Sequence, residues 1–317
     1  MSDLPSTVFI REVGPREGFQ IEKNPISTRD KVRLIDALSD TGVKDIEVTS
    51  FVRPELVPQM ADADEVVKQL RRKSGVSYSA VYLNAKGFQR ARATGKLDLR
   101  ATLSLSASES FSKRNTNRTV EQAIQDMPER VGMIQDAGIN TVNLGVSAAF
   151  GCNFEGDVPQ ERVVERLDRL FAIAEEHYLS VAGIRLMDTM GWANPIQVKR
   201  MVGALRDRWP DVPIGLHLHD TRGLGIANAF AALEMGVADF DTAVGGLGGC
   251  PFAANRGAAG NIATEDFLLM CQETGIDTGV DLDAMIECAK LAETIVGHPL
   301  PGKVMTGGNL NAYRNRA

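Results

Sequence analysis

Short apolar, β-branched runs alternate along the whole chain with longer segments in which apolar residues recur every three or four positions. The first pattern is typical of buried parallel strands and the second of amphipathic helices. Strands are predicted at 8–13, 44–49, 76–81, 99–105, 141–146, 180–186, 213–219 and 239–244. Helices are predicted at 27–41, 62–72, 85–95, 119–137, 160–178, 195–208, 225–236 and 264–275, with a last helix at 281–296.

This alternation predicts an α/β protein, a (β/α)8 TIM barrel with an extra C-terminal helix. A doubly wound open sheet is the alternative, but such sheets usually carry a glycine-rich phosphate loop after the first strand. The corresponding segment here, 14–18, lacks that glycine spacing. Since no linker-like composition divides the chain, we predict a single catalytic domain over 1–300 and a C-terminal tail at 301–317.

Composition narrows the setting and the partners. The net charge of -6 and the pI near 5.4 argue against a nucleic-acid binder, which usually shows a basic face. The four cysteines form no CxxC pair, which favours a reducing, intracellular compartment. The N-terminal residues resemble neither a signal nor a transit peptide, and no apolar run is long enough to span a bilayer. We therefore expect a soluble, cytoplasmic protein without membrane partners.

A barrel of this class carries its chemistry at the C-terminal ends of its strands. The unusual polar residues of this chain follow the predicted strands. They are Arg16, Glu17 and Gln20 after the first, Glu47 and Ser50 at the second, Asp188 after the sixth, His217 and His219 at the seventh, and the glycine-rich segment 245–261 with Cys250 and Asn261 after the eighth.

The pair His217 and His219 is the strongest single indication of chemistry. Side chains two residues apart on a strand point to the same face, which suits one metal ion. Two strand-end histidines held by hydrogen bonds are the alternative. Two imidazoles with one carboxylate make a divalent-metal site with positions open to substrate, and Glu17 is the best carboxylate candidate. Asn261 could add a carbonyl oxygen; the set suits Mg²⁺ or Mn²⁺ but would also accept Zn²⁺ or Fe²⁺.

Three further residues suit proton transfer and charge stabilisation beside a metal. Arg16 offers a permanently charged, planar fork of donors for an enolate or carboxylate oxygen. Glu47 is expected to orient a metal ligand or Arg16, or else to form an ion pair at the rim. Cys250, in a segment that suits a flexible lid, is a candidate proton donor, although free cysteines are more often inert apolar residues.

At this point the motifs resemble one family closely, 3-hydroxy-3-methylglutaryl-CoA lyase and its metal-dependent aldol-type lyase relatives. The likeness covers roughly residues 8 to 300. The matching stretches occur in the same order and lie at 12–20, 47–52, 57–62, 106–109, 150–156, 187–191, 217–221 and 246–252.

The resemblance implies metal-dependent retro-Claisen cleavage of 3-hydroxy-3-methylglutaryl-CoA, or of a close 3-hydroxyacyl-CoA relative, to acetyl-CoA and a 3-oxo acid. It implies that Mg²⁺ or Mn²⁺ is held by Glu17, His217, His219 and Asn261, and that the protein is a homodimer. Arg16 would stabilise the leaving enolate and Cys250 would protonate it, while Glu47 and Asp188 support proton transfer and ligand geometry. Gln20, Ser50 and Lys23 would contact the substrate, with Lys23 and Lys113 near the CoA phosphates.

Two departures from the family pattern bear on specificity. The usual Arg-Asp pair is Arg16-Glu17 here, one methylene longer, and the segment 250–261 is longer than in typical lyases. Both touch the predicted metal site, so we expect retained chemistry on a different acyl group. Two other functions stay open: a related metal-dependent aldolase or condensing synthase acting on a 2-oxo acid, and a non-catalytic metal-binding barrel.

Overall fold

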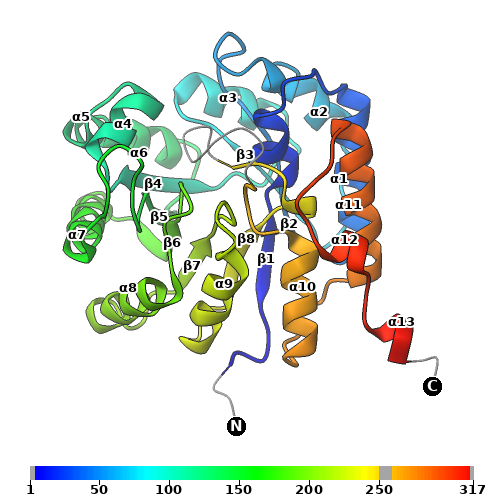
Figure 1. Cartoon of the computed structure of the whole chain (residues 1–317). Helices are drawn as coiled ribbons and strands as arrows, with labels where there is room; N and C mark the ends of the chain where they lie inside the picture. The colour runs from blue at the N-terminus through cyan, green and yellow to red at the C-terminus, as the bar shows by residue number, and fades with distance from the viewer. Residues whose placement is uncertain (1–3, 250–258, 315–317) are drawn as a thin grey trace. The chain divides into compact units, whose positions relative to one another are not determined.

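The computed structural model describes residues 4–249 and 259–314 (Figure 1). These residues form two compact units. Among these residues the first unit comprises 4–5 and 100–239, and the second comprises 6–99, 240–249 and 259–314. The prediction of one domain over 1–300 stays a prediction. Cys250 lies outside the described residues.

The first unit is built on four parallel strands in the order β7-β6-β5-β4. Figure 1 shows α7 and α8 outside these strands. The strands are β4 (Ala101–Ser106), β5 (Thr141–Ser147), β6 (Ser180–Met187) and β7 (Ile214–His217). The helices are α4 (Glu109–Thr116), α5 (Val120–Gln125), α6 (Met127–Gln135), α7 (Gln160–Glu176), α8 (Pro195–Arg208) and α9 (Gly225–Glu234).

The second unit carries the strands ordered β3-β2-β1-β8. They are β1 (Phe9–Glu12), β2 (Asp45–Ser50), β3 (Ser77–Val81) and β8 (Asp239–Thr242), whose first residue belongs to the first unit. Its α-helices are α1 (Thr28–Asp40), α2 (Ala63–Gln69), α3 (Ala85–Ala93), α10 (Thr264–Glu273), α11 (Leu282–Val296), α12 (Val304–Gly307) and α13 (Asn311–Arg314). A π-helical turn, η1 (Gly14–Gly18), follows β1, and the 3-10 turns are η2 (Pro58–Met60) and η3 (Val244–Gly246).

Helix α1 shows how local chemistry sets an element. The Ser27 side chain accepts a hydrogen bond from the Asp30 amide, as expected of an N-cap. The face formed by Leu34, Ile35 and Leu38 is buried. Gly42, just beyond the helix, adopts a left-handed φ of 97° that ends it. The predicted helix 27–41 is thus confirmed to within a residue at each end.

Several predicted elements end two or three residues early, among them the strand at 239–244 and the helix at 62–72, and two further differences need a physical explanation. The helix predicted at 119–137 is divided into α5 and α6, because Pro128 occupies the first turn of α6 and has no amide to continue α5. The strand predicted at 213–219 ends at His217, so His219 lies two residues beyond it. Helix α4 and the turn η1 were missed, since both are short and carry no helical hydrophobic repeat.

The C-terminal ends of the strands carry the polar residues that the barrel prediction placed there. Strand β7 is buried along its length, as is typical of a central parallel strand. Beyond the strands, the chain continues into Asp188 after β6, His219 after β7 and the turn η1 after β1. The fold therefore places Asp188, His219 and the turn that carries Arg16 and Glu17 directly after strands.

Candidate active site

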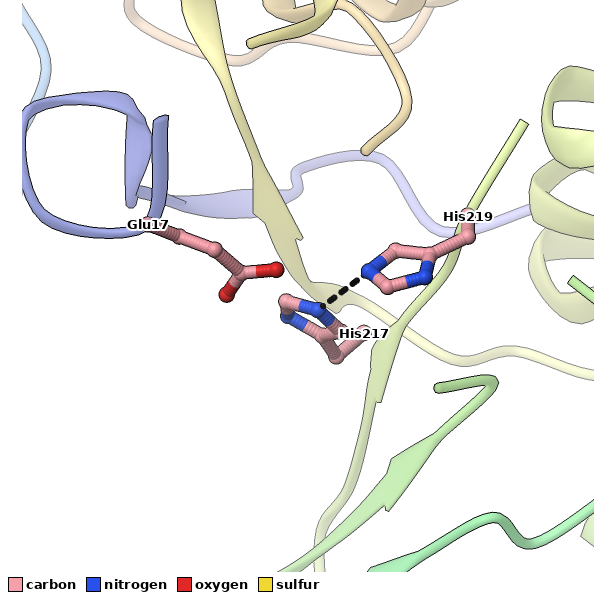
Figure 2. Close-up of side chains that lie close together, drawn as sticks. All are labelled: Glu17, His217 and His219. Atoms are coloured by element: carbon pink, nitrogen blue, oxygen red, sulfur yellow. Dashed lines mark hydrogen bonds between the residues drawn. The ribbon is translucent and has the colours of Figure 1, made fainter. Parts of the chain in front are cut away.

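The imidazoles of His217 and His219 face each other within the first unit (Figure 2). Their Nε2 atoms are 3.1 Å apart, and the ring planes meet at 66°. Both residues are buried, with exposed fractions of 7% and 3%. The predicted proximity of the two rings is thus confirmed, although His219 is outside the strand that was expected to align them.

The short separation of the two Nε2 atoms requires a proton or a cation between them. Two ring nitrogens at this distance form a hydrogen bond only if one carries the proton. A divalent cation held by both imidazoles would satisfy the lone pairs of both nitrogens instead. The buried pair therefore fits adjacent ligand positions of one cation.

Asp188, which follows β6, is a buried carboxyl group in the same unit. Its Oδ1 accepts hydrogen bonds from the amides of Trp192 at 2.7 Å and Ala193 at 3.1 Å. Its Oδ2 is buried and has no hydrogen-bond partner among the described residues. Burial raises the pKa of Asp188, and the charge of His219 opposes that rise. This carboxyl group therefore accepts a proton more readily than an exposed aspartate.

The π-helical turn η1 carries Arg16 and Glu17 in the second unit. Such turns are rare and occur often at functional sites. Arg16 Nη2 lies 3.1 Å from Glu17 Oε2, and Arg16 Nε donates to Glu47 Oε1 in a short contact. Burial would lower the pKa of Arg16, but the two carboxylates raise it above its ordinary value, so the guanidinium stays charged. Glu47 thus holds Arg16 in place, which agrees with both interpretations of Glu47.

Asn261 lies beside Glu17 in the second unit. Its Nδ2 donates to Glu17 Oε1 at 3.2 Å and to the carbonyl of Leu247 at 2.9 Å. Its Oδ1 is buried and has no hydrogen-bond partner among the described residues. A buried carbonyl oxygen without a donor is rare, and a cation is one group that satisfies it.

The remaining predicted residues occupy different environments in the second unit. Ser50 is buried, and its Oγ has no hydrogen-bond partner among the described residues. Gln20 is half-buried and Lys23 is exposed. The hypothesis for Cys250 cannot be placed, because that residue is outside the described part of the chain.

Sequence reasoning missed a buried carboxylate, Glu12, at the end of β1. Its Oε1 accepts hydrogen bonds from the amides of Gly14 at 2.7 Å and Val244 at 3.0 Å. Its Oε2 accepts from Thr264 Oγ1 at 2.6 Å. Desolvation raises the pKa of Glu12 to about 7. One signal was available, a glutamate at a position where the strand pattern calls for an apolar residue.

A second missed feature is a network of charged side chains that includes Arg16 and Glu17 of η1. Arg11 Nε donates to Asp45 Oδ2 at 3.0 Å, and its Nη1 lies 3.8 Å from Asp241 Oδ1. With Arg16, Glu17 and Glu47, these residues place two arginines among four carboxylates. The excess of negative charge favours a cation at this end of the unit.

Comparisons with known proteins give one consistent result. A family model described as HMGL-like matches residues 7–292. The chain is 40% identical over 311 residues to hydroxymethylglutaryl-CoA lyase YngG of Bacillus subtilis, covering 98% of this chain and 99% of that protein. It is 41% identical over 287 residues to the mitochondrial hydroxymethylglutaryl-CoA lyase of Homo sapiens, covering 90% and 85%.

A solved structure supports the fold directly. An HMG-CoA lyase from Acinetobacter baumannii, in complex with coenzyme A and 3-methylmalate, is similar with a TM-score of 0.86 at 37% identity, covering 98% of this chain and 97% of that one. The predicted α/β fold of the TIM-barrel class is thereby confirmed. None of the helices in the described residues has both the length and the apolar character needed to cross a membrane.

Proposed function

Given that the chain belongs to the HMGL-like family, we propose that it is a metal-dependent carbon–carbon lyase. Its substrate is 3-hydroxy-3-methylglutaryl-CoA or a closely related 3-hydroxyacyl-CoA, and its products are acetyl-CoA and a 3-oxo acid. The observation that carries the proposal is the buried pair of imidazoles, His217 and His219, with their Nε2 atoms 3.1 Å apart.

The metal ligands in this proposal are Glu17, His217, His219 and Asn261, and the first three are labelled in Figure 2. Two nitrogen and two oxygen donors suit Mg²⁺ or Mn²⁺. The buried, unpartnered Oδ1 of Asn261 supports its assignment among the described residues. When bound, the cation polarises oxygen atoms of the substrate and so favours loss of the hydroxyl proton.

The protein's own residues manage the protons and the developing charge. Asp188, with its raised pKa, accepts the proton of the substrate's tertiary hydroxyl. As the carbon–carbon bond breaks, its electron pair passes to the thioester carbonyl, and the guanidinium of Arg16 stabilises that enolate oxygen. Cys250 then donates a proton to the enolate carbon, which completes acetyl-CoA. Glu47 acts through Arg16 by holding its guanidinium.

Substrate binding is assigned to Gln20, Ser50 and Lys23. Ser50 offers a buried hydroxyl without a partner among the described residues, which suits a polar group of the acyl chain. Lys23 is exposed and positively charged, which suits a CoA phosphate. A homodimer in the cytoplasm is the expected form of the protein.

Glu17 bears on which acyl group the protein accepts. Glu17 stands where the resemblance implies an aspartate, so its carboxylate reaches one methylene further. A change of that size moves a ligand enough to favour a different branched 3-hydroxyacyl group. The complex of the Acinetobacter relative with coenzyme A supports an acyl-CoA substrate.

A substrate screen tests the proposal. Purified protein is incubated with branched 3-hydroxyacyl-CoAs, with and without a chelator, and acetyl-CoA is measured by a coupled assay. We expect acetyl-CoA release that stops on chelation and returns with Mn²⁺. Turnover of a 2-oxo acid instead would favour the aldolase or synthase, and Mn²⁺ binding without turnover of any acyl-CoA would favour the non-catalytic barrel.

A further inference from the structure

We propose that Glu12 is a positioning residue that fixes the turn carrying Arg16 and Glu17 relative to the start of the glycine-rich segment leading to Asn261. This inference rests on the proposed function, because Glu17 and Asn261 are the two metal ligands assigned to the second unit. The hydrogen bonds of Glu12 come from two backbone amides and a threonine hydroxyl, so we assign it a role that acts through its neighbours.

The contacts of Glu12 join segments that are remote in sequence. A single oxygen, Oε1, accepts from the amide of Gly14 in η1 and from the amide of Val244 in η3. The partners Glu12 and Val244 are 232 residues apart. The other oxygen accepts from the hydroxyl of Thr264, the first residue of α10. One fully buried carboxylate therefore connects β1, η1, η3 and α10.

The two backbone amides that donate hydrogen bonds to Glu12 need a buried acceptor. Amides in the first turn of a helical segment have no acceptor within that segment. Both lie in buried backbone, where an unsatisfied amide costs more than a net hydrogen bond contributes. The fit is close, since a Cβ atom added at Gly14 would lie 2.7 Å from Glu12 Oε1. A carboxylate or a carboxamide fits this space and satisfies both amides.

Two routes, each a series of contacts along the chain, connect Glu12 to the proposed metal ligands. One route runs through Gly14 along η1 to Arg16 and Glu17. The other runs through Val244 to Leu247, whose carbonyl accepts from Asn261 Nδ2.

Asn261 Nδ2 also donates to Glu17 Oε1, so the two routes meet and the contacts form a closed ring. A ring of contacts leaves little freedom in the separation of Glu17 and Asn261. Ligand sets tolerate displacements of only about 0.5 Å, so this restraint bears directly on metal affinity.

The adjacent amide of Gly245 is held in a similar way. It donates to Oε2 of Glu265, another buried carboxylate, at 3.0 Å. Gly245 has a left-handed φ of 67°, which its lack of a side chain permits. The start of the glycine-rich segment is thus fixed at two consecutive amides, and Glu12 is the one of the two carboxylates that also binds η1.

Two buried threonines provide a matched pair of variants. The hydroxyls of Thr242 and Thr264 are 2.7 Å apart and both residues are fully buried, but only Thr264 donates to Glu12. Thr264→Val removes that donor without a change of shape, and Thr242→Val is the control. Glu12→Gln is the conservative variant. Its carboxamide oxygen can still accept hydrogen bonds from both backbone amides, and its carboxamide NH2 group can donate one to the hydroxyl of Thr264.

The variants are compared by Mn²⁺ binding in isothermal titration and by mass-spectrometric hydrogen exchange of peptides spanning 8–20 and 240–249. We expect Thr264→Val to weaken Mn²⁺ binding about 10-fold relative to Thr242→Val, as is typical when an outer partner of a metal site is lost. We also expect faster exchange in both peptides. Glu12→Gln should bind Mn²⁺ within about 3-fold of the unmodified protein, because the acceptor geometry is kept.

Equal effects of the two threonine variants on Mn²⁺ affinity would overturn the positioning role. A folded Glu12→Gln protein that loses Mn²⁺ would also overturn it, because that result would show that charge rather than hydrogen bonding is needed. Failure of the unmodified protein to bind Mn²⁺ would instead overturn the proposed metal-dependent function, on which the role of Glu12 depends.

Discussion

The two sets of proposed metal ligands differ in how the chain brings their side chains together. His217 and His219 are neighbours in the sequence, and the end of one strand suffices to make them face each other. Glu17 and Asn261 are 244 residues apart, and their contact depends on η1, η3 and a buried carboxylate. The first set is brought together by local sequence, whereas the second is brought together by contacts between distant segments.

The largest expected effect comes from breaking the local set. His219→Ala removes a proposed ligand, so we expect Mn²⁺ affinity to fall by more than about 100-fold, beyond the loss seen for outer partners. Mn²⁺ titration measures this. His177→Ala, at the end of α7, is the control and should leave the affinity unchanged. An unaltered titration of His219→Ala would exclude it as a ligand.

Cys250→Ala separates chemistry from metal binding. We expect turnover to fall by at least about 100-fold, the lower end for a positioned proton donor, with Mn²⁺ affinity nearly intact. Cys288→Ala, in the buried face of α11, is the matched control and should keep its turnover. Steady-state assays with the best substrate of the screen give both values, and near-normal turnover of Cys250→Ala would remove its assigned role.

Glu17→Asp probes the set that depends on tertiary contacts. Shortening this ligand by one methylene should shift the ratio of kcat/KM between 3-hydroxy-3-methylglutaryl-CoA and the best native substrate by about 10-fold, in favour of the former. Competition assays with both thioesters measure the ratio. If activity on both substrates falls equally, Glu17 does not set acyl specificity.

The smallest expected effect is on how the free energy of unfolding depends on pH. The pKa of Glu12 rises from 4.5 to about 7 on folding, so the folded state is favoured while Glu12 is protonated and loses stability as pH rises through this range. The Glu12→Gln side chain cannot ionise, so the free energy of unfolding should fall less between pH 5 and pH 7.5 than in the unmodified protein. The difference between the two proteins should be at most about 3 kcal/mol. Denaturant unfolding at both values measures the difference, and parallel pH profiles would contradict the buried-carboxylate interpretation.

The fold was predictable because its signals are local. Strand positions and most helix boundaries follow from hydrophobic period and from end signals such as Ser27 and Gly42. The errors occurred where a short-range feature overrode the period: Pro128 within a long helical pattern, and the early end of β7 at His217. The turn η1 had no sequence signal beyond its proline and glycines.

The sequence alone determined the chemistry of the candidate residues: two histidines at strand spacing, an arginine with an adjacent glutamate after β1, and motifs that identify the family. Only the tertiary structure decided how those residues are held. It showed Glu47 against Arg16, Asn261 against Glu17, and Glu12 between Gly14 and Val244. Apart from that of Glu12 with Gly14, these contacts join residues far apart in the chain, and no local pattern records them. They follow from the parallel arrangement of strands, which brings the ends of distant segments to one edge.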